Sequence, residues 1–389
     1  MQEVGWSMNA KERILTVLRR EAPDIIPFSV YFETLQLAGL AVYEPWRKLL
    51  DKGLCLHVPL IAQMYKVNCP NAKMDIIHQY GNRTSWSPLD LLIALEEPHD
   101  IVGKITTPVG EITCKASLKS LDLLVQLPWF QEDGYLIKDI KDYEVIKYLI
   151  EDAEYVPNYD DFKELEMILG NFGIVDSLMP KSPLQSLIML MGPKKLSLDY
   201  YMHQKEFDDL YRVIYKKQLE IYKIAAESPA KVIWAPDNVT SLITSPKLFE
   251  RYNIPFYNEV ADILHKYDKI YIVHMDGTLK NLVKLIAKTR IDVIESFTHP
   301  PVGDLTIREA KKLWKDKVIW ANFPEPVSMQ GQKAVRAKTI EMLNDAAPGD
   351  NFLMGISEGF PSFQHMLKFV PIILKTINKY GKYPITKNY

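Results

Sequence analysis

The stretch Lys269-Ile-Tyr-Ile-Val-His-Met-Asp-Gly277 decides the fold. Its apolar part, residues 270–273, predicts a short buried β-strand that ends in a His-x-Asp-Gly turn. Because side chains alternate along a strand, His274 and Asp276 point to the same side. Two potential metal or acid–base groups are therefore expected at the carboxyl end of a strand, where ligands and chemistry are found in α/β proteins.

Other stretches with strand character are spread over the whole chain. Those after residue 170 are mostly spaced 20 to 60 residues apart, and each gap contains a helical pattern. Alternating strands and helices indicate a parallel sheet, and eight strands favour a closed (β/α)8 TIM barrel. The competing architecture, an open doubly wound sheet, lacks a G-x-G-x-x-G or G-x-x-x-x-G-K-[ST] loop to support it. The eight predicted strands are residues 28–32, 54–58, 172–175, 232–234, 270–273, 293–294, 318–320 and 352–354.

Capping signals mark several helix starts. Asn9 with Glu12, and Thr306 with Glu309, have the spacing of capping boxes, and Ser245 stands before Pro246 as an N-cap residue. Thr278 is the predicted N-cap of a helix whose apolar stripe is formed by Leu279, Leu282, Val283 and Ile286.

The section around residues 54–116 interrupts this rhythm. It contains short β-prone pieces and a hairpin signal at Pro108-Val-Gly110. We expect an insertion of antiparallel strands in a single barrel domain that extends over residues 1–389.

Composition limits the functions that the chain can have. Hydrophobic residues make up 47% and charged residues 25%, which allows a sizeable core. The net charge of −2 gives no reason to expect binding to nucleic acid or to a membrane surface. Three cysteines without a CxxC pattern, no signal peptide and no apolar run of about 20 residues predict a soluble cytoplasmic protein.

Polar residues recur where the predicted strands end, and this recurrence is the signal for a site. His274, Asp276 and Glu358 form an N/O ligand set suited to Zn²⁺, Mn²⁺ or Fe²⁺. Glu295 is a candidate ligand, orienter of His274 or general base. In the structural alternatives, Asp276 is only part of a turn or a helix cap, and His274 is a hydrogen-bonded histidine of the core. The remaining candidates are Asp237 as a second catalytic residue, or a loop cap, and Asn238, Asn322 and His299 as substrate-binding residues.

The other histidines lack a partner at metal spacing. We expect most of them on surfaces or at helix ends; they are His57, His78, His99, His203, His265 and His365.

Several of these motifs are similar to those of the uroporphyrinogen decarboxylase superfamily, and together they cover nearly the whole chain. The resemblance implies a (β/α)8 barrel. The motifs are Asn9-Ala-Lys-Glu-Arg-Ile-Leu15, Ala22-Pro-Asp-Ile-Ile-Pro27, His274-x-Asp-Gly277, Asp292-Val-Ile-Glu-Ser-Phe297, Gly303-Asp304 and Gly355-x-x-Glu-Gly359.

The superfamily has two branches of different chemistry. Its decarboxylases use no metal and have an arginine-rich segment near the first strand, where this chain has Tyr31-Phe-Glu-Thr-Leu-Gln-Leu37. Its cobalamin-dependent methyltransferases bind zinc through H-x-C and a later cysteine. Those positions match His274, Asp276 and Glu358 here, so that carboxylates stand where the family has thiolates.

The resemblance therefore implies a metal-dependent methyltransferase. Such an enzyme moves a methyl group between a small, for example methoxylated, substrate and a corrinoid on a partner protein. The alternative is a decarboxylase or lyase that acts on another carboxylic acid, and a non-catalytic binding barrel is the third option. Family members often form homodimers, so a homodimer is an option here too.

Overall fold

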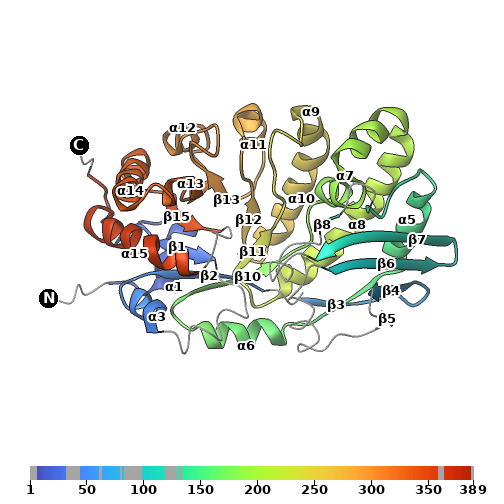
Figure 1. Cartoon of the computed structure of the whole chain (residues 1–389), viewed down its shortest axis with the longest axis horizontal. Coiled ribbons are helices and arrows are strands. Elements are labelled where there is room, and N and C mark those ends of the chain that lie inside the picture. The colour runs from blue at the N-terminus through green and yellow to red at the C-terminus, as the bar shows by residue number, and fades with distance from the viewer. Residues whose placement is uncertain are drawn as a thin grey trace. The chain divides into compact units, whose positions relative to one another are not determined.

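The computed structural model describes residues 7–31, 44–60, 64–78, 81–82, 99–118, 129–130, 134–357 and 363–386. Eight parallel strands in these residues form a closed barrel, in the order β1-β15-β14-β13-β12-β11-β10-β2 (Figure 1). The predicted (β/α)8 barrel is thus confirmed. Its strands are β1 (Phe28–Tyr31), β2 (Cys55–Leu60), β10 (Gly173–Leu178), β11 (Val232–Ala235), β12 (Ile270–His274), β13 (Val293–Thr298), β14 (Val318–Asn322) and β15 (Phe352–Ile356).

Helices follow the barrel strands, and α14 and α15 pack against each other. The predicted caps at Asn9, Ser245 and Thr306 are all present, because each side chain accepts the expected backbone N–H. The helices are α1 (Ala10–Leu18), α3 (Glu44–Leu50), α6 (Asp160–Leu169), α9 (Pro246–Leu248), η2 (Phe249–Asn253), α10 (Ile254–His265), η3 (Lys280–Leu282), α11 (Val283–Ile286), α12 (Ile307–Leu313), α13 (Glu325–Ser328), α14 (Gln332–Ala346) and α15 (Phe363–Tyr380).

Helix α1 closes the amino-terminal end of the barrel. Its buried side chains, which include Ile14 and Val17, form one apolar cluster with the first inward-facing residues of the strands, such as Val232, Val293 and Val318. This cluster fills the lower part of the barrel. Polar groups in the lumen therefore lie above an apolar floor, on the side of the strands' carboxyl ends.

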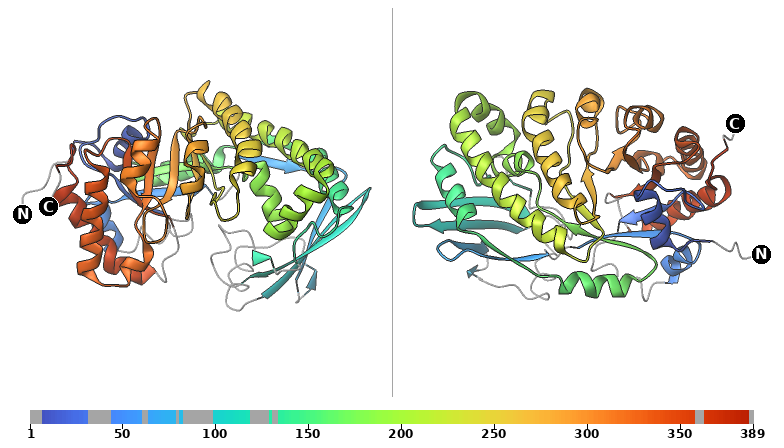
Figure 2. Two further views of the ribbon diagram at one scale, coloured as in Figure 1. Left: turned by 90° about the horizontal axis from the view of Figure 1, so that it is seen from above. Right: turned by 180° about the vertical axis from the view of Figure 1, so that it is seen from behind.

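The antiparallel strands predicted as an insertion are present after β2. They form a two-stranded sheet, β3-β9, and a five-stranded sheet in the order β5-β4-β6-β7-β8. Strands β6 and β7 are joined by the predicted hairpin, in which Thr107 pairs with Gly110 (Figure 2). The elements are β3 (Tyr65–Asn68), β4 (Lys73–His78), β5 (Gly81–Asn82), β6 (His99–Thr107), β7 (Gly110–Leu118), β8 (Trp129–Phe130), α5 (Asp142–Asp152), β9 (Glu154–Pro157), α7 (Pro183–Met202) and α8 (Gln204–Glu227).

The chain separates into two compact units. The first comprises Met1–Met64, Tyr159–Met179 and Ala225–Tyr389 and contains the whole barrel. The second comprises Tyr65–Asn158 and Pro180–Ile224 and contains the antiparallel sheets. Both are formed from more than one stretch of sequence, and the single domain inferred from the sequence stays a prediction.

Among the helices that the structure describes, none has the length and apolar character needed to span a bilayer.

Candidate functional site

His274 and Glu295 form the centre of the site. They are direct neighbours in the register of β12 and β13, and both side chains point into the barrel. The Nδ1 atom of His274 lies 2.7 Å from Oε2 of Glu295, and the indole nitrogen of Trp234 donates to the same oxygen at 3.0 Å. Of the three roles that the sequence left open for Glu295, this contact corresponds to the orientation of His274, because it fixes one of the two ring nitrogens.

Glu295 is fully buried. Burial by itself raises the pKa of a carboxyl group, but His274, His57 and the Trp234 donor outweigh it and hold the pKa of Glu295 below its ordinary value. The second oxygen, Oε1, has no hydrogen-bond partner among the described residues. A buried carboxylate with an unpaired oxygen is costly for folding, which is typical of a functional site.

A second buried pair, His57 on β2 and Asp176 on β10, lies in the same lumen. His57 Nε2 makes a short contact with Asp176 Oδ2. The pairing of the two strands depends on Gly173, because a Cβ atom there would lie 1.9 Å from the carbonyl oxygen of Leu56. The expectation that most of the six other histidines lie at surfaces or helix ends is wrong for His57, which is 1% exposed.

The sequence did carry a signal for this second pair. His57 stands two residues after Cys55 in an apolar strand, and Asp176 stands two residues after Ile174. Cys55 and Ile174 belong to the apolar floor of the barrel, so the alternation along each strand turns His57 and Asp176 inward as well. What the sequence lacked was the register that places them side by side.

Aromatic rings surround the two pairs. The ring of His57 lies 4.5 Å from that of Trp320 and 6.0 Å from that of Trp234, measured between centroids. Tyr31 contacts His57 edge-on at 5.5 Å, and Trp234 contacts His274 at 5.9 Å. The ionisable groups therefore lie in surroundings of low polarity, where interactions between charges are strong.

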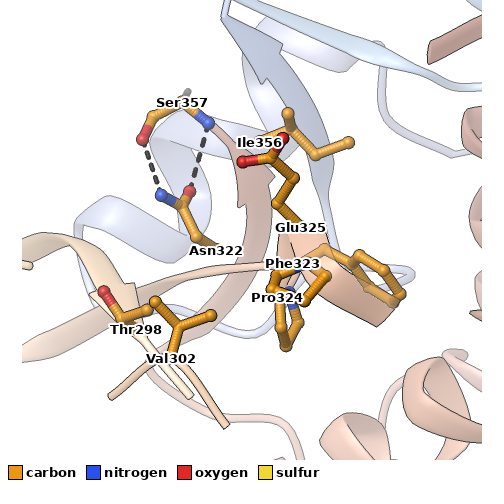
Figure 3. Close-up of a pocket in the computed structure, with 9 residues that line it drawn as sticks. Thr298, Val302, Asn322, Phe323, Pro324, Glu325, Ile356 and Ser357 are labelled. Atoms are coloured by element: carbon orange, nitrogen blue, oxygen red, sulfur yellow. Dashed lines mark hydrogen bonds between the residues drawn. The ribbon is translucent and has the colours of Figure 1, made fainter. Parts of the chain in front are cut away.

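A third polar group is formed by Ser296 on β13, Asn322 on β14 and Ser357 directly after β15. Asn322 Nδ2 donates to Ser296 Oγ at 2.6 Å. It also donates to Ser357 Oγ at 2.7 Å, while its Oδ1 accepts the Ser357 N–H at 3.2 Å (Figure 3). Ser296 reaches this position because β13 has a bulge between Ile294 and Phe297, where Ser296 has a φ of +60°. The bulge turns both Glu295 and Ser296 inward.

Asn322 and Ser357 line a cavity of about 130 Å³. Figure 3 shows Thr298, Val302, Phe323, Pro324 and Glu325 around the same space. This volume and lining suit a small organic molecule or part of a larger one. The candidate role of Asn322 in substrate binding stays a prediction, and its position in the cavity wall agrees with it.

Three other predicted residues follow the barrel strands. The carboxylate of Asp237 accepts a short hydrogen bond from Tyr257 on α10. His299 donates from Nδ1 to the Pro300 carbonyl at 2.9 Å, and its Nε2 lies 3.4 Å from Asp345 on α14. Asn238 is exposed, with a φ of +52°. These contacts tie Asp237 and His299 to helices outside the barrel wall.

The structure describes two of the three predicted metal ligands, His274 and Asp276. Glu295 holds Nδ1 of His274, and Asp276 is half-buried in the turn after β12. In that turn Gly277 has a φ of +65° and donates its N–H to Thr298. Glu358 lies outside the described residues. Among the residues that the structure does describe, no three His, Cys, Asp or Glu side chains stand together in a way that could hold a metal ion.

The fold and these side chains define a (β/α)8 barrel with two buried histidine–carboxylate pairs in its lumen. Residues 179–369 match the model of the uroporphyrinogen decarboxylase (URO-D) family. This match confirms the resemblance seen in the motifs. The comparison with curated protein sequences found no match.

The chain is also similar to solved structures. A methyltransferase from Methanosarcina mazei is 13% identical, with a TM-score of 0.55 over 96% of this chain and 99% of that one. The GH18 chitinase ChiB from Flavobacterium johnsoniae is 8% identical, with a TM-score of 0.37 over 92% of this chain and 95% of that one. At this identity the first likeness shows a common fold.

Proposed function

We propose that this protein is an enzyme that transfers a methyl group from a small substrate, with the barrel lumen as its active site. The observation that carries the proposal is the buried His274–Glu295 pair at the carboxyl end of β12 and β13. The URO-D match and the fold shared with a protein named as a methyltransferase support it.

His274, Asp276 and Glu358 are the proposed ligands of a divalent metal, with zinc as the first candidate. Glu295 fits this role as the partner that orients the histidine, because metal-binding histidines usually donate their other ring N–H to a carboxylate or carbonyl. A metal bound there would act as a Lewis acid toward a substrate oxygen or nitrogen. Independently of the metal, Glu295 holds the His274 ring in one orientation, and the apolar floor excludes water from below.

The methyl acceptor in this proposal is a corrinoid carried by a partner protein. This part rests on the resemblance to the methyltransferase branch of the superfamily. The lumen residues would then position the substrate, and the cavity beside Asn322 and Ser357 would receive its non-reacting part.

The test measures metal content and methyl transfer together. Protein purified without chelator is assayed for bound metal and for methyl transfer from methoxybenzenes to reduced cobalamin. We expect near-stoichiometric metal and turnover, with both lost in His274→Ala. His265→Ala is the matched control, because His265 also contacts an aspartate, Asp292, but lies on the surface.

Two outcomes would contradict the proposal. Metal-free protein in which His274→Ala changes nothing would remove the metal site. Release of CO₂ from carboxylic acids without methyl transfer would favour the decarboxylase alternative.

A further inference from the structure

The His57–Asp176 pair has no part in the function proposed above, although it lies in the same lumen. Asp176 is fully buried and its Oδ1 atom has no hydrogen-bond partner among the described residues. The pair lies above the apolar floor formed by α1, Cys55 and Ile174. A histidine and an aspartate that filled space only would be replaceable by apolar residues at lower cost.

The geometry of the pair is that of an oriented acid–base residue. Asp176 contacts Nε2 of His57 and fixes the plane of the ring. This contact leaves Nδ1 as the nitrogen that can face a ligand, and 2% of the side-chain surface of His57 remains exposed. In catalytic histidine–aspartate pairs the carboxylate holds one ring nitrogen in this way while the other transfers the proton.

The charges around His57 favour its protonated form. Asp176 on β10 and Glu295 on β13 face it as carboxylates, and His274 on β12 opposes them. Tyr31 on β1 contacts the ring edge-on. Burial lowers the pKa of His57, but the two carboxylates outweigh burial, so that the pKa lies above its ordinary value.

We propose that His57, oriented by Asp176, is the residue that donates a proton to the substrate atom from which the methyl group leaves. The inference rests on the proposed function. A reduced corrinoid on the partner would supply the electron pair of the new bond to the methyl carbon, while the bond between that carbon and the substrate heteroatom breaks. The heteroatom keeps the bonding pair and takes the proton from Nδ1, which leaves a neutral imidazole that is reprotonated from water.

The first test uses substrates with different leaving groups. His57→Gln, Asp176→Asn and the control His265→Gln are assayed for methyl transfer from methoxybenzene and from 4-nitromethoxybenzene. With methoxybenzene we expect kcat to fall about 10²–10⁴-fold in His57→Gln. With 4-nitromethoxybenzene, whose leaving group needs less protonation, we expect a much smaller fall, and the control is expected to match the wild type with both.

An equal loss of kcat with both substrates would overturn the proposal, because a structural role would not depend on the leaving group. A wild type without methyl transfer would instead refute the proposed function.

The second test does not need turnover. The ring of His57 is titrated by NMR in wild-type protein labelled on histidine, with His57→Gln used to assign the signal. We expect a pKa above about 6.5 that falls in Asp176→Asn. A ring that stays neutral down to pH 6, or a pKa that Asp176→Asn leaves unchanged, would show that Asp176 does not prepare His57 to donate a proton.

Discussion

At the scale of single residues, contacts between side chains decide what each polar group of the lumen can do. Glu295 occupies the centre: it holds His274, accepts from Trp234 and raises the pKa of His57 through its charge. His57 and Asp176 extend this group across the lumen, with Glu295 influencing the pKa of both. Four ionisable side chains therefore act as one unit, and a change in one alters the others.

Glu295→Gln tests the orienting role of this carboxylate. The amide keeps the size of the side chain and can still accept from Trp234. It loses the negative charge that attracts the ring of His274. We expect metal affinity to fall about 10- to 100-fold in a protein that still folds. Titration with zinc, alongside a circular dichroism spectrum, measures both. Unchanged affinity would show that Glu295 does not serve the metal site.

Asp24 and Arg13 form a further ion pair that is largely buried. The two carboxylate oxygens of Asp24 accept from Nε and Nη2 of Arg13 at 2.6 and 2.9 Å, and Arg13 is 1% exposed. Burial raises the pKa of Asp24, but Arg13 outweighs it and holds the pKa below its ordinary value. This pair joins α1 to the segment before β1, and so supports the floor of the barrel.

Asp24→Asn should cost about 3 kcal/mol at neutral pH, because it leaves the Arg13 charge buried and unpaired. The folded-state pKa of Asp24 is lowered, so its contribution is present above about pH 4 and is lost as the pH falls through the folded-state value. Urea unfolding at several pH values measures this. We expect the difference between wild type and variant to shrink in acid, and a constant difference would contradict the pair's role.

At the scale of elements, local signals set where most helices begin, but not all. The capping boxes at Asn9 and Thr306 form as their spacing predicts. The prediction for Thr278 is wrong: its hydroxyl contacts Thr240 and Ser241 instead, and the backbone starts with the 3₁₀-helix η3. The cap comes from Asp304, 25 residues beyond Leu279, whose N–H it accepts at 2.8 Å.

Asp304→Ala tests this distant cap. The carboxylate accepts hydrogen bonds from the N–H groups of both Leu279 and Lys280. Its loss therefore removes the acceptor of two backbone donors at the helix start. We expect a loss of about 1 kcal/mol in the free energy of unfolding, as for other N-caps. Glu250→Ala is the control, since its pair with Lys288 is more than half exposed and should contribute less than about 0.5 kcal/mol. Equal effects in the two variants would argue against a cap.

At the scale of the whole molecule, the barrel is closed by one helix from the amino-terminal part of the chain. Helix α1 packs under strands that come from positions between residues 55 and 353. The floor therefore contacts strands from the entire barrel. We expect a substitution that destabilises it to lower the stability of all these strands together.

Ile14→Ala removes a fully buried side chain from this floor. We expect a loss of about 2–5 kcal/mol, the range for large-to-small substitutions in cores. Urea unfolding followed by tryptophan fluorescence reports it, because Trp234 and Trp320 lie in the same cluster. Arg19→Ala, an exposed position next to α1, is the control. If the fluorescence transition were unchanged in Ile14→Ala, α1 would not be part of the cooperative core.

The sequence by itself determined the barrel, the antiparallel insertion, three helix caps and the position of His274 at a strand end. These follow from local periodicity and from the spacing of a few polar residues, which short-range physics fixes. The tertiary structure decided the rest: that Glu295 holds His274, that His57 meets Asp176, that a bulge turns Ser296 inward, and that Asp237 and His299 contact outer helices. Each of these depends on strand register or on packing between segments far apart in the chain, and no local pattern specifies either.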